Sequence, residues 1–129
     1  MSKKRDNIFF MEIFNDILKI NEQEITIVYD KYNNIWFGLR DILIVLKYTS
    51  LDKIISKIKV SSNNINVYKK IHPFPRGKGT IKLHKKFINE SGLYELLSIS
   101  TKPLAKVFMD EYFTNIMPEI RKTLLYFFF

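Results

Sequence analysis

The alternation of apolar and polar positions changes its period along the chain, and this change predicts a mixture of strands and helices. Apolar, aromatic and β-branched residues dominate 8–14 and 24–29, and both segments are typical of strands. A turn-like stretch of Asp and Asn at 30–34 precedes the apolar segment 35–37, so 24–37 predicts a hairpin. After it, apolar residues recur at helical spacing, which predicts a buried helix over 39–46.

The middle of the chain predicts one helix and a pair of strands that present lysines. In 50–59 the apolar residues share one helical face, and Lys53 and Lys57 lie together on another. Two further strands, 67–72 and 80–88, are predicted on either side of a segment rich in proline and glycine. Basic and apolar residues alternate along the second strand, so the pair should form a ribbon with one basic face.

The last third predicts helices. Asn89 is a suitable cap for a helix over 90–98, and Thr101 for a helix that has Pro103 in its first turn. A final turn or short helix is expected over 119–122.

No repeat or linker divides the sequence. We therefore predict a single domain over 1–123, followed by an apolar tail at 124–129. The predicted fold class is α+β, a small antiparallel sheet with a basic β-ribbon packed against four to five short helices.

Positive charge is concentrated in one part of the chain. The 129 residues carry 21 Lys and Arg against 13 Asp and Glu, a formal net charge of +8. The segment Lys47–Lys86 holds eleven basic residues and one acid, Asp52, so it carries +10 and the remainder −2. Base composition alone would spread lysine evenly, so this segregation predicts a basic surface patch that attracts phosphates.

Catalysis and metal binding find little support in the residues. The chain has no cysteine, and Gly77–Thr80 lacks the spacing of a phosphate-binding loop. His72 and His84 have no acid nearby in sequence that would complete a metal site. Asp41 is interpreted as structural, pairing with Arg40 or capping a helix. We expect no enzyme activity, no cofactor, no metal and no small-molecule substrate.

Membrane insertion is not expected either, because no apolar run reaches the roughly 18 residues that a spanning helix needs. The chain is predicted to be soluble and intracellular.

Five motifs in order resemble those of a known family. They are 35–43 (IWFGLRDIL), 46–48 (LKY), 86–97 (KFINESGLYELL), 100–108 (STKPLAKVF) and 117–123 (MPEIRKT). Together they resemble the Bro-N domain, the N-terminal domain of baculovirus repeated-open-reading-frame proteins and of many prophage antirepressors. The resemblance covers about 22–123. One departure is Lys47, which stands where the family usually has glycine.

The resemblance implies an α+β DNA-binding domain of a viral or phage regulatory protein, located in the host cytoplasm or nucleus, in a family not known for catalysis. The expected partner is DNA, double- or single-stranded. Lysine is a mobile point charge and arginine is scarce, so recognition should be weakly specific. The predicted DNA-binding residues are Lys53, Lys57, Lys59, Lys69, Lys70, Arg76, Lys78, Lys82, Lys85 and Lys86.

Two alternatives stay open at this stage. Tyr68, His72, Phe74 and His84 lie among the lysines and are candidates to stack on single-stranded bases, although Tyr68 is better explained as core. The second alternative is that the chain is a protein-interaction module, like an antirepressor, that binds another regulator or forms a homodimer. Its apolar tail would then be buried in that interface rather than on its own sheet.

Overall fold

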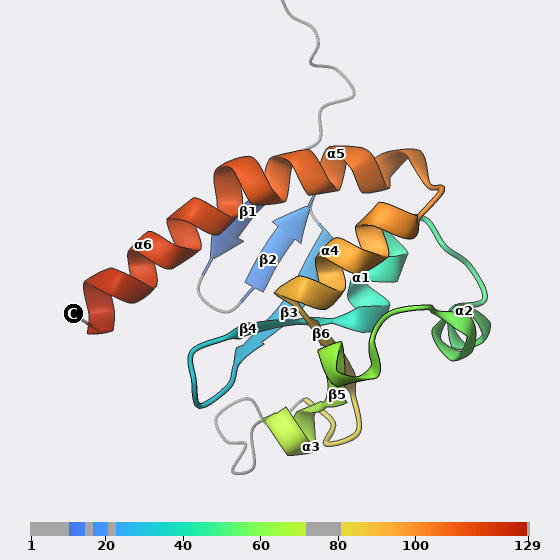
Figure 1. Ribbon diagram of the computed structural model, residues 1–129, viewed down its shortest axis with the longest axis horizontal. Coiled ribbons are helices and arrows are strands. Elements are labelled where there is room, and N and C mark those ends of the chain that lie inside the picture. Colours follow the sequence, from blue (N-terminus) through green and yellow to red (C-terminus); the bar gives the residue numbers. More distant parts are fainter. Residues whose placement is uncertain (1–10, 15–16, 21–22, 72–80, 129) are drawn as a thin grey trace, which may run out of the picture.

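A six-stranded antiparallel sheet, in the order β1-β2-β3-β4-β6-β5, organises the molecule (Figure 1). The computed structural model describes residues 11–14, 17–20, 23–71 and 81–128, and the side chains of 18–20, 23–71 and 81–122. The strands are β1 (Met11–Phe14), β2 (Ile17–Ile20), β3 (Gln23–Tyr29), β4 (Ile35–Gly38), β5 (Ile65–Val67) and β6 (Lys86–Asn89).

Short helices connect and cover these strands, which confirms the predicted α+β class. They are α1 (Leu39–Val45), α2 (Leu51–Lys57), α3 (Tyr68–Ile71), α4 (Glu90–Ile99), α5 (Pro103–Glu111) and α6 (Met117–Phe128). A 3-10 turn, η1 (Ser62–Asn64), precedes β5, and a π-helical turn, η2 (Tyr112–Ile116), joins α5 to α6. The structure thus contains β2 and α3, which the sequence pattern did not predict.

The predicted hairpin is present as β3 and β4, and Asp30 organises its turn. The Asp30 carboxylate accepts hydrogen bonds from the backbone amides of Tyr32 and Asn34, both at 2.9 Å, and from Trp36 Nε1 at 3.0 Å. Asn33 adopts a positive φ of 66°, which Asn tolerates better than most residues. The turn residues therefore fix the register of the two strands.

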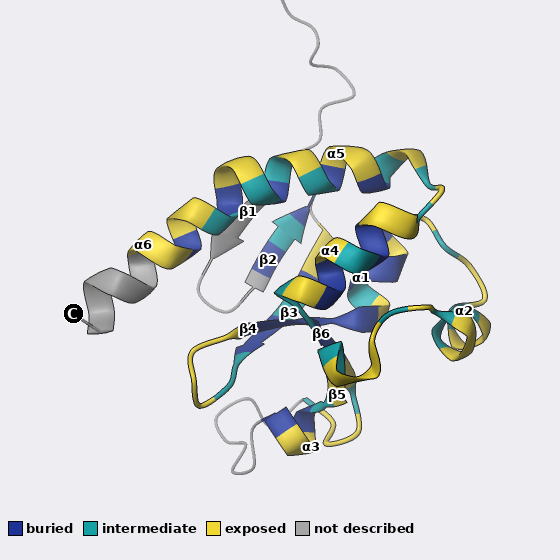
Figure 2. Ribbon diagram, viewed as in Figure 1, coloured by how far each residue is buried: buried dark blue, intermediate teal, exposed yellow. Residues whose placement is uncertain are grey.

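Apolar residues pack on both faces of the sheet at β4, which is buried along its whole length (Figure 2). Alternation along β4 sends Phe37 into the main core and Trp36 into a second, smaller cluster. The main core lies between the sheet and α1, α4, α5 and η2, and includes the buried Phe108 of α5. The second cluster contains Tyr68 and Ile71 of α3, so this one-turn helix closes the other face.

The predicted basic β-ribbon is shorter than expected. Instead of strands over 67–72 and 80–88, β5 pairs with β6 over three residues, and α3 follows β5 directly. Tyr68 and Ile71 are both buried in the second cluster. Residues three apart share one face of a helix but lie on opposite faces of a strand, so burying both requires a helical turn.

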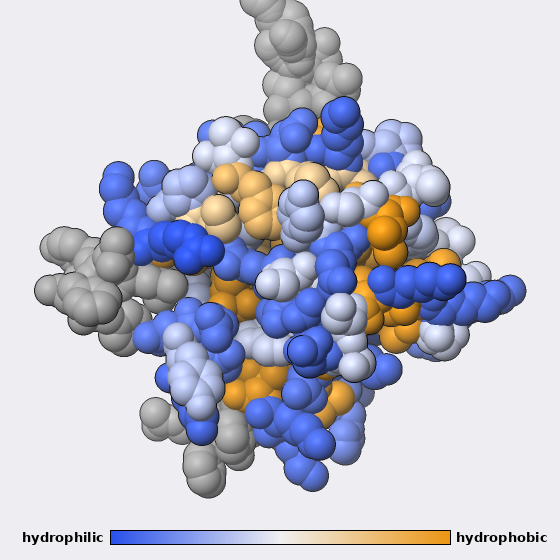
Figure 3. All heavy atoms as spheres, viewed as in Figure 1, coloured by the Kyte–Doolittle hydropathy of each residue, from blue (hydrophilic) through white to orange (hydrophobic). Residues whose placement is uncertain are grey.

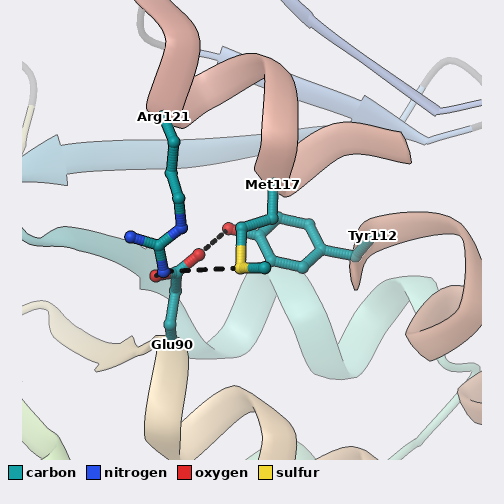
Figure 4. A network of polar contacts seen from close by, with 4 residues as sticks. All are labelled: Glu90, Tyr112, Met117 and Arg121. Atoms are coloured by element: carbon teal, nitrogen blue, oxygen red, sulfur yellow. Dashed lines mark hydrogen bonds and ion pairs between the residues drawn. The ribbon is translucent and has the colours of Figure 1, made fainter. Parts of the chain in front are cut away.

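The final helix is longer than the predicted turn over 119–122. α6 runs from Met117 to Phe128 and so includes most of the apolar tail. The side chains of the tail are outside the part of the chain that the structure describes. Glu90, the first residue of α4, anchors this helix (Figure 4): it accepts hydrogen bonds from the Tyr112 hydroxyl at 2.6 Å and from Arg121 at 3.3 Å. Burial, and then the bond to Glu90, raise the pKa of the Tyr112 hydroxyl, which therefore remains a donor.

Candidate nucleic-acid interface

Helix α2 presents two lysines to solvent, as predicted. Lys53 and Lys57 are exposed, whereas Leu51, Ile54 and Ile55 pack partly buried against the main core. Ser50 precedes the first residue of this helix, but its side chain makes no capping hydrogen bond. A helix of seven residues thus has one apolar and one basic face.

A surface hollow of about 350 Å³ places the start of β6 beside α2. Its lining residues are Arg40, Asp52, Ile55, Ser56, His84, Lys85 and Lys86. Lys86 also lines a second hollow, formed with residues between Ile58 and Val67. Residues 84–86 therefore lie next to α2, at Asp52, Ile55 and Ser56, although about 30 positions separate the two segments in sequence.

Backbone hydrogen bonds bring α3 to the same region. The Lys69 amide donates to the Leu83 carbonyl, and the Tyr68 amide to the Lys85 carbonyl, both at 2.9 Å. Lys69, Lys70 and Lys82 are all exposed. The β5–β6 pairing thus continues irregularly past the strands and sets the lysines of α3 beside 82–86.

We call the exposed lysines of 53–59, of α3 and of 82–86 the basic strip. It consists of Lys53, Lys57, Lys59, Lys69, Lys70, Lys82 and Lys86, all exposed. Figure 3 shows hydrophilic side chains spread over the visible face, with apolar ones between them. Leu83, predicted to point inward from a strand, is instead 46% exposed, because no strand forms there.

Lys85 differs from the other candidate residues because its charge is already paired. Its Nζ lies 3.3 Å from Asp41 Oδ2 and 5.8 Å from the centre of the Phe87 ring. The same Asp41 oxygen accepts the backbone amide of Thr26 at 3.0 Å. Asp41 is therefore structural, but the expectation that it pairs with Arg40 is wrong: Arg40 pairs with Asp52.

Of the remaining candidate residues, one lies in the core, one is exposed and four are outside the described residues. Tyr68 is buried against Phe87, with ring centroids 6.0 Å apart, which confirms its interpretation as core. Arg76 and Lys78, together with the predicted stacking residues His72 and Phe74, lie outside the described residues. Of the predicted stacking residues that the structure describes, only His84 is exposed.

The connection between α2 and β5 is fixed by polar contacts to α4. Glu95 accepts hydrogen bonds from Asn64 Nδ2 and from the Ser61 hydroxyl, both at 2.9 Å, and these bonds lower the pKa of its carboxyl. Asn89 caps α4 as predicted, accepting the Gly92 amide at 2.8 Å, and donates to Asn64 at 3.2 Å. These hydrogen bonds therefore hold the backbone between α2 and β5 against α4.

Sequence reasoning missed Arg40 as a part of this surface. It lies at the start of α1, outside the basic segment, and only the packing of α1 against α2 brings it to the hollow. Over the described ranges, no three His, Asp or Glu side chains gather as metal ligands would, and no helix there is long and apolar enough to cross a membrane.

An antiparallel sheet covered by short helices defines a small α+β domain. Residues 24–118 match the model of the BRO family, N-terminal domain (Bro-N), and the chain belongs to this family. The family comprises DNA-binding domains of viral and phage regulatory proteins and is not known for catalysis.

The fold is also similar to a solved structure. This is the N-terminal domain of Orf22, an envelope protein of Cydia pomonella granulovirus, with a TM-score of 0.56 and 13% sequence identity. The match covers 88% of this chain and 97% of the granulovirus domain. No curated protein sequence matches the chain.

Proposed function

We propose that this chain binds DNA through the basic strip, as part of a viral or phage regulator. The observation that carries the proposal is that the segment 83–86 lies beside both α2 and α3, and that exposed lysines occur on α2, on α3 and within 82–86. Each lysine that neutralises a phosphate releases a condensed counterion, so several together give strong, salt-dependent binding.

Recognition through this strip is weakly specific. Its seven described members are all lysines, which contact phosphate as point charges. Bidentate contacts to guanine are typical of arginine, and the strip contains none. Arg76 and Lys78, which follow α3 in sequence, belong to the proposed contact set. We leave Lys85 out of the contact set because Asp41 holds its charge.

The fold alone does not select DNA as the ligand, since the similar granulovirus domain belongs to an envelope protein. A partner-binding domain is accordingly the competing function. Titration of fluorescently labelled duplex and single-stranded DNA with the chain, at several salt concentrations, separates the two. Affinity that falls steeply with salt supports DNA binding; no binding at low salt contradicts it and favours the partner-binding function.

A further inference from the structure

Asp52, the single acid of the basic segment, forms an ion pair with an arginine outside that segment. Arg40 in the first turn of α1 and Asp52 in the first turn of α2 form an ion pair, with Nη1 2.5 Å from Oδ1. Their side chains are 50% and 93% exposed. An exposed ion pair of this kind shifts the folding equilibrium by at most about fivefold, so either partner can exchange this contact for another at little cost.

The pair borders the hollow between α2 and β6. The exposed His84 and Lys86 offer hydrogen-bond donors to it, whereas the Ser56 hydroxyl donates to the Lys53 carbonyl at 2.8 Å. Ser56, His84 and Lys86 line it together with Arg40. The Lys85 ammonium also lines it, but is tethered to Asp41. The hollow thus gathers cationic and donor groups around space that no described side chain fills, and the Asp52 carboxylate on its border is paired with Arg40.

We propose that this hollow binds one phosphate group and that Asp52 is an internal competitor, which holds Arg40 until phosphate displaces it. The proposal rests on the proposed function insofar as the phosphate belongs to a DNA backbone. The planar guanidinium of Arg40 binds two phosphate oxygens at once, which no lysine of the strip does. The hollow therefore fixes the position of one phosphate, and the mobile lysines follow the backbone on either side.

A double-mutant cycle tests the competition. Duplex DNA affinity is measured for the wild type, Arg40→Gln, Asp52→Asn and the double variant, each shown to be folded by its thermal unfolding. We expect Arg40→Gln to weaken binding about tenfold and Asp52→Asn to tighten it about fivefold. In the Arg40→Gln background, Asp52→Asn should have less than a twofold effect. An equal gain in both backgrounds means that Asp52 acts only through net charge, and overturns the proposal.

A second titration separates this proposal from the proposed function. Inorganic phosphate is added to wild type and Asp52→Asn, followed by NMR shifts of Arg40, Ser56, His84 and Lys86. If DNA binds but the cycle shows no coupling and phosphate shifts none of these signals, the hollow is overturned and the strip stands.

If no DNA binds, the proposed function fails and the phosphate titration decides alone. Shifts confined to the hollow, at lower phosphate concentration in Asp52→Asn, support a site for free phosphate groups. No shifts overturn it. Where DNA does bind, phosphate shifts without coupling in the cycle equally assign the hollow to free phosphate rather than to the DNA backbone.

Discussion

Lys85 and Asp41, 44 positions apart in sequence, form a half-buried ion pair that ties the approach to β6 to the start of α1. Their side chains are 26% and 19% exposed. Asp41 also accepts the Thr26 amide, so one carboxylate connects β3, α1 and the segment before β6. A lysine at the end of the basic segment thus stabilises the fold rather than offering a free charge to DNA.

Replacing Lys85 should therefore affect stability more than binding. Lys85→Met leaves the half-buried Asp41 carboxylate without its cation, and we expect a loss of about 1–2 kcal/mol in the free energy of unfolding. Its neighbour Lys86 is exposed and provides the matched control: Lys86→Met should leave stability within about 0.5 kcal/mol and weaken DNA binding. Urea unfolding and DNA titration of both variants check this, and the reverse pattern would show that the two roles are misassigned.

Lys47 occupies a position that favours glycine. Its φ is 73°, and the Tyr48 and Lys47 amides donate to the carbonyls of Leu43 and Ile44 in the pattern that ends a helix with a left-handed residue. We predict that Lys47→Gly raises the free energy of unfolding by about 1 kcal/mol, because glycine has no Cβ to strain there. Lys47→Ala removes the same charge but keeps a Cβ, and should give no gain; an equal gain from both would refute the backbone explanation.

Gly92 has no room for a side chain. A Cβ at this position would lie 2.6 Å from Ile88 Cγ1 and 2.9 Å from Asn64 Cβ. Gly92→Ala should consequently lower the free energy of unfolding by about 1–3 kcal/mol, since β6 or η1 must move. The adjacent Ser91 is exposed, and Ser91→Ala should stay within about 0.5 kcal/mol of wild type in the same unfolding measurement. A Gly92→Ala protein as stable as wild type would contradict this packing.

Asp30 should make the fold sensitive to acid. Burial opposes its ionisation, but the hydrogen bonds from Trp36, Asn34 and Tyr32 together outweigh burial and lower its pKa from 3.8. A folded-state pKa below the unfolded one gives stability that is complete above about pH 4 and is lost as pH falls through the folded pKa. Asp30→Asn should lower stability at neutral pH by about 1 kcal/mol and flatten its dependence on pH below 4. Unfolding curves at pH 7 and pH 3 test this; an unchanged pH dependence would exclude Asp30 as the cause.

Local patterns were sufficient wherever neighbouring residues decide the structure. The β3–β4 hairpin follows from the turn chemistry of 30–34, and the start of α4 from the Asn89 cap, which accepts the Gly92 amide. Both depend on contacts within a few positions. The sequence predicted them for the physical reasons that the structure shows.

Tertiary burial decided the elements that the sequence did not predict. The sequence pattern predicts a strand over 67–72, yet the second cluster buries both Tyr68 and Ile71, which requires a helical turn. β2 has only four residues, too few for a clear period, and is defined by its pairing with β1 and β3.

The candidate site, too, has features that the sequence predicted and features that depend on tertiary packing. The exposed lysines of α2 were predictable from helical spacing. In contrast, the pairings Lys85–Asp41 and Arg40–Asp52 depend on which elements meet in space. Spacing along the chain therefore located the basic surface but not the two ion pairs that decide which of its charges are free.

The central claim, that the basic strip binds DNA, is tested most directly by charge reversals at different places. All three variants have the same net charge as one another. Lys53→Glu/Lys57→Glu and Lys69→Glu/Lys70→Glu alter the strip, and Lys106→Glu/Lys122→Glu makes the same change at exposed lysines of α5 and α6. Duplex affinity is measured by fluorescence anisotropy across a salt series. We predict that each strip variant loses more than about tenfold in affinity and that its salt slope falls by about two, while the control stays close to wild type. Equal losses in all three variants, or an unchanged affinity in both strip variants, would contradict the account.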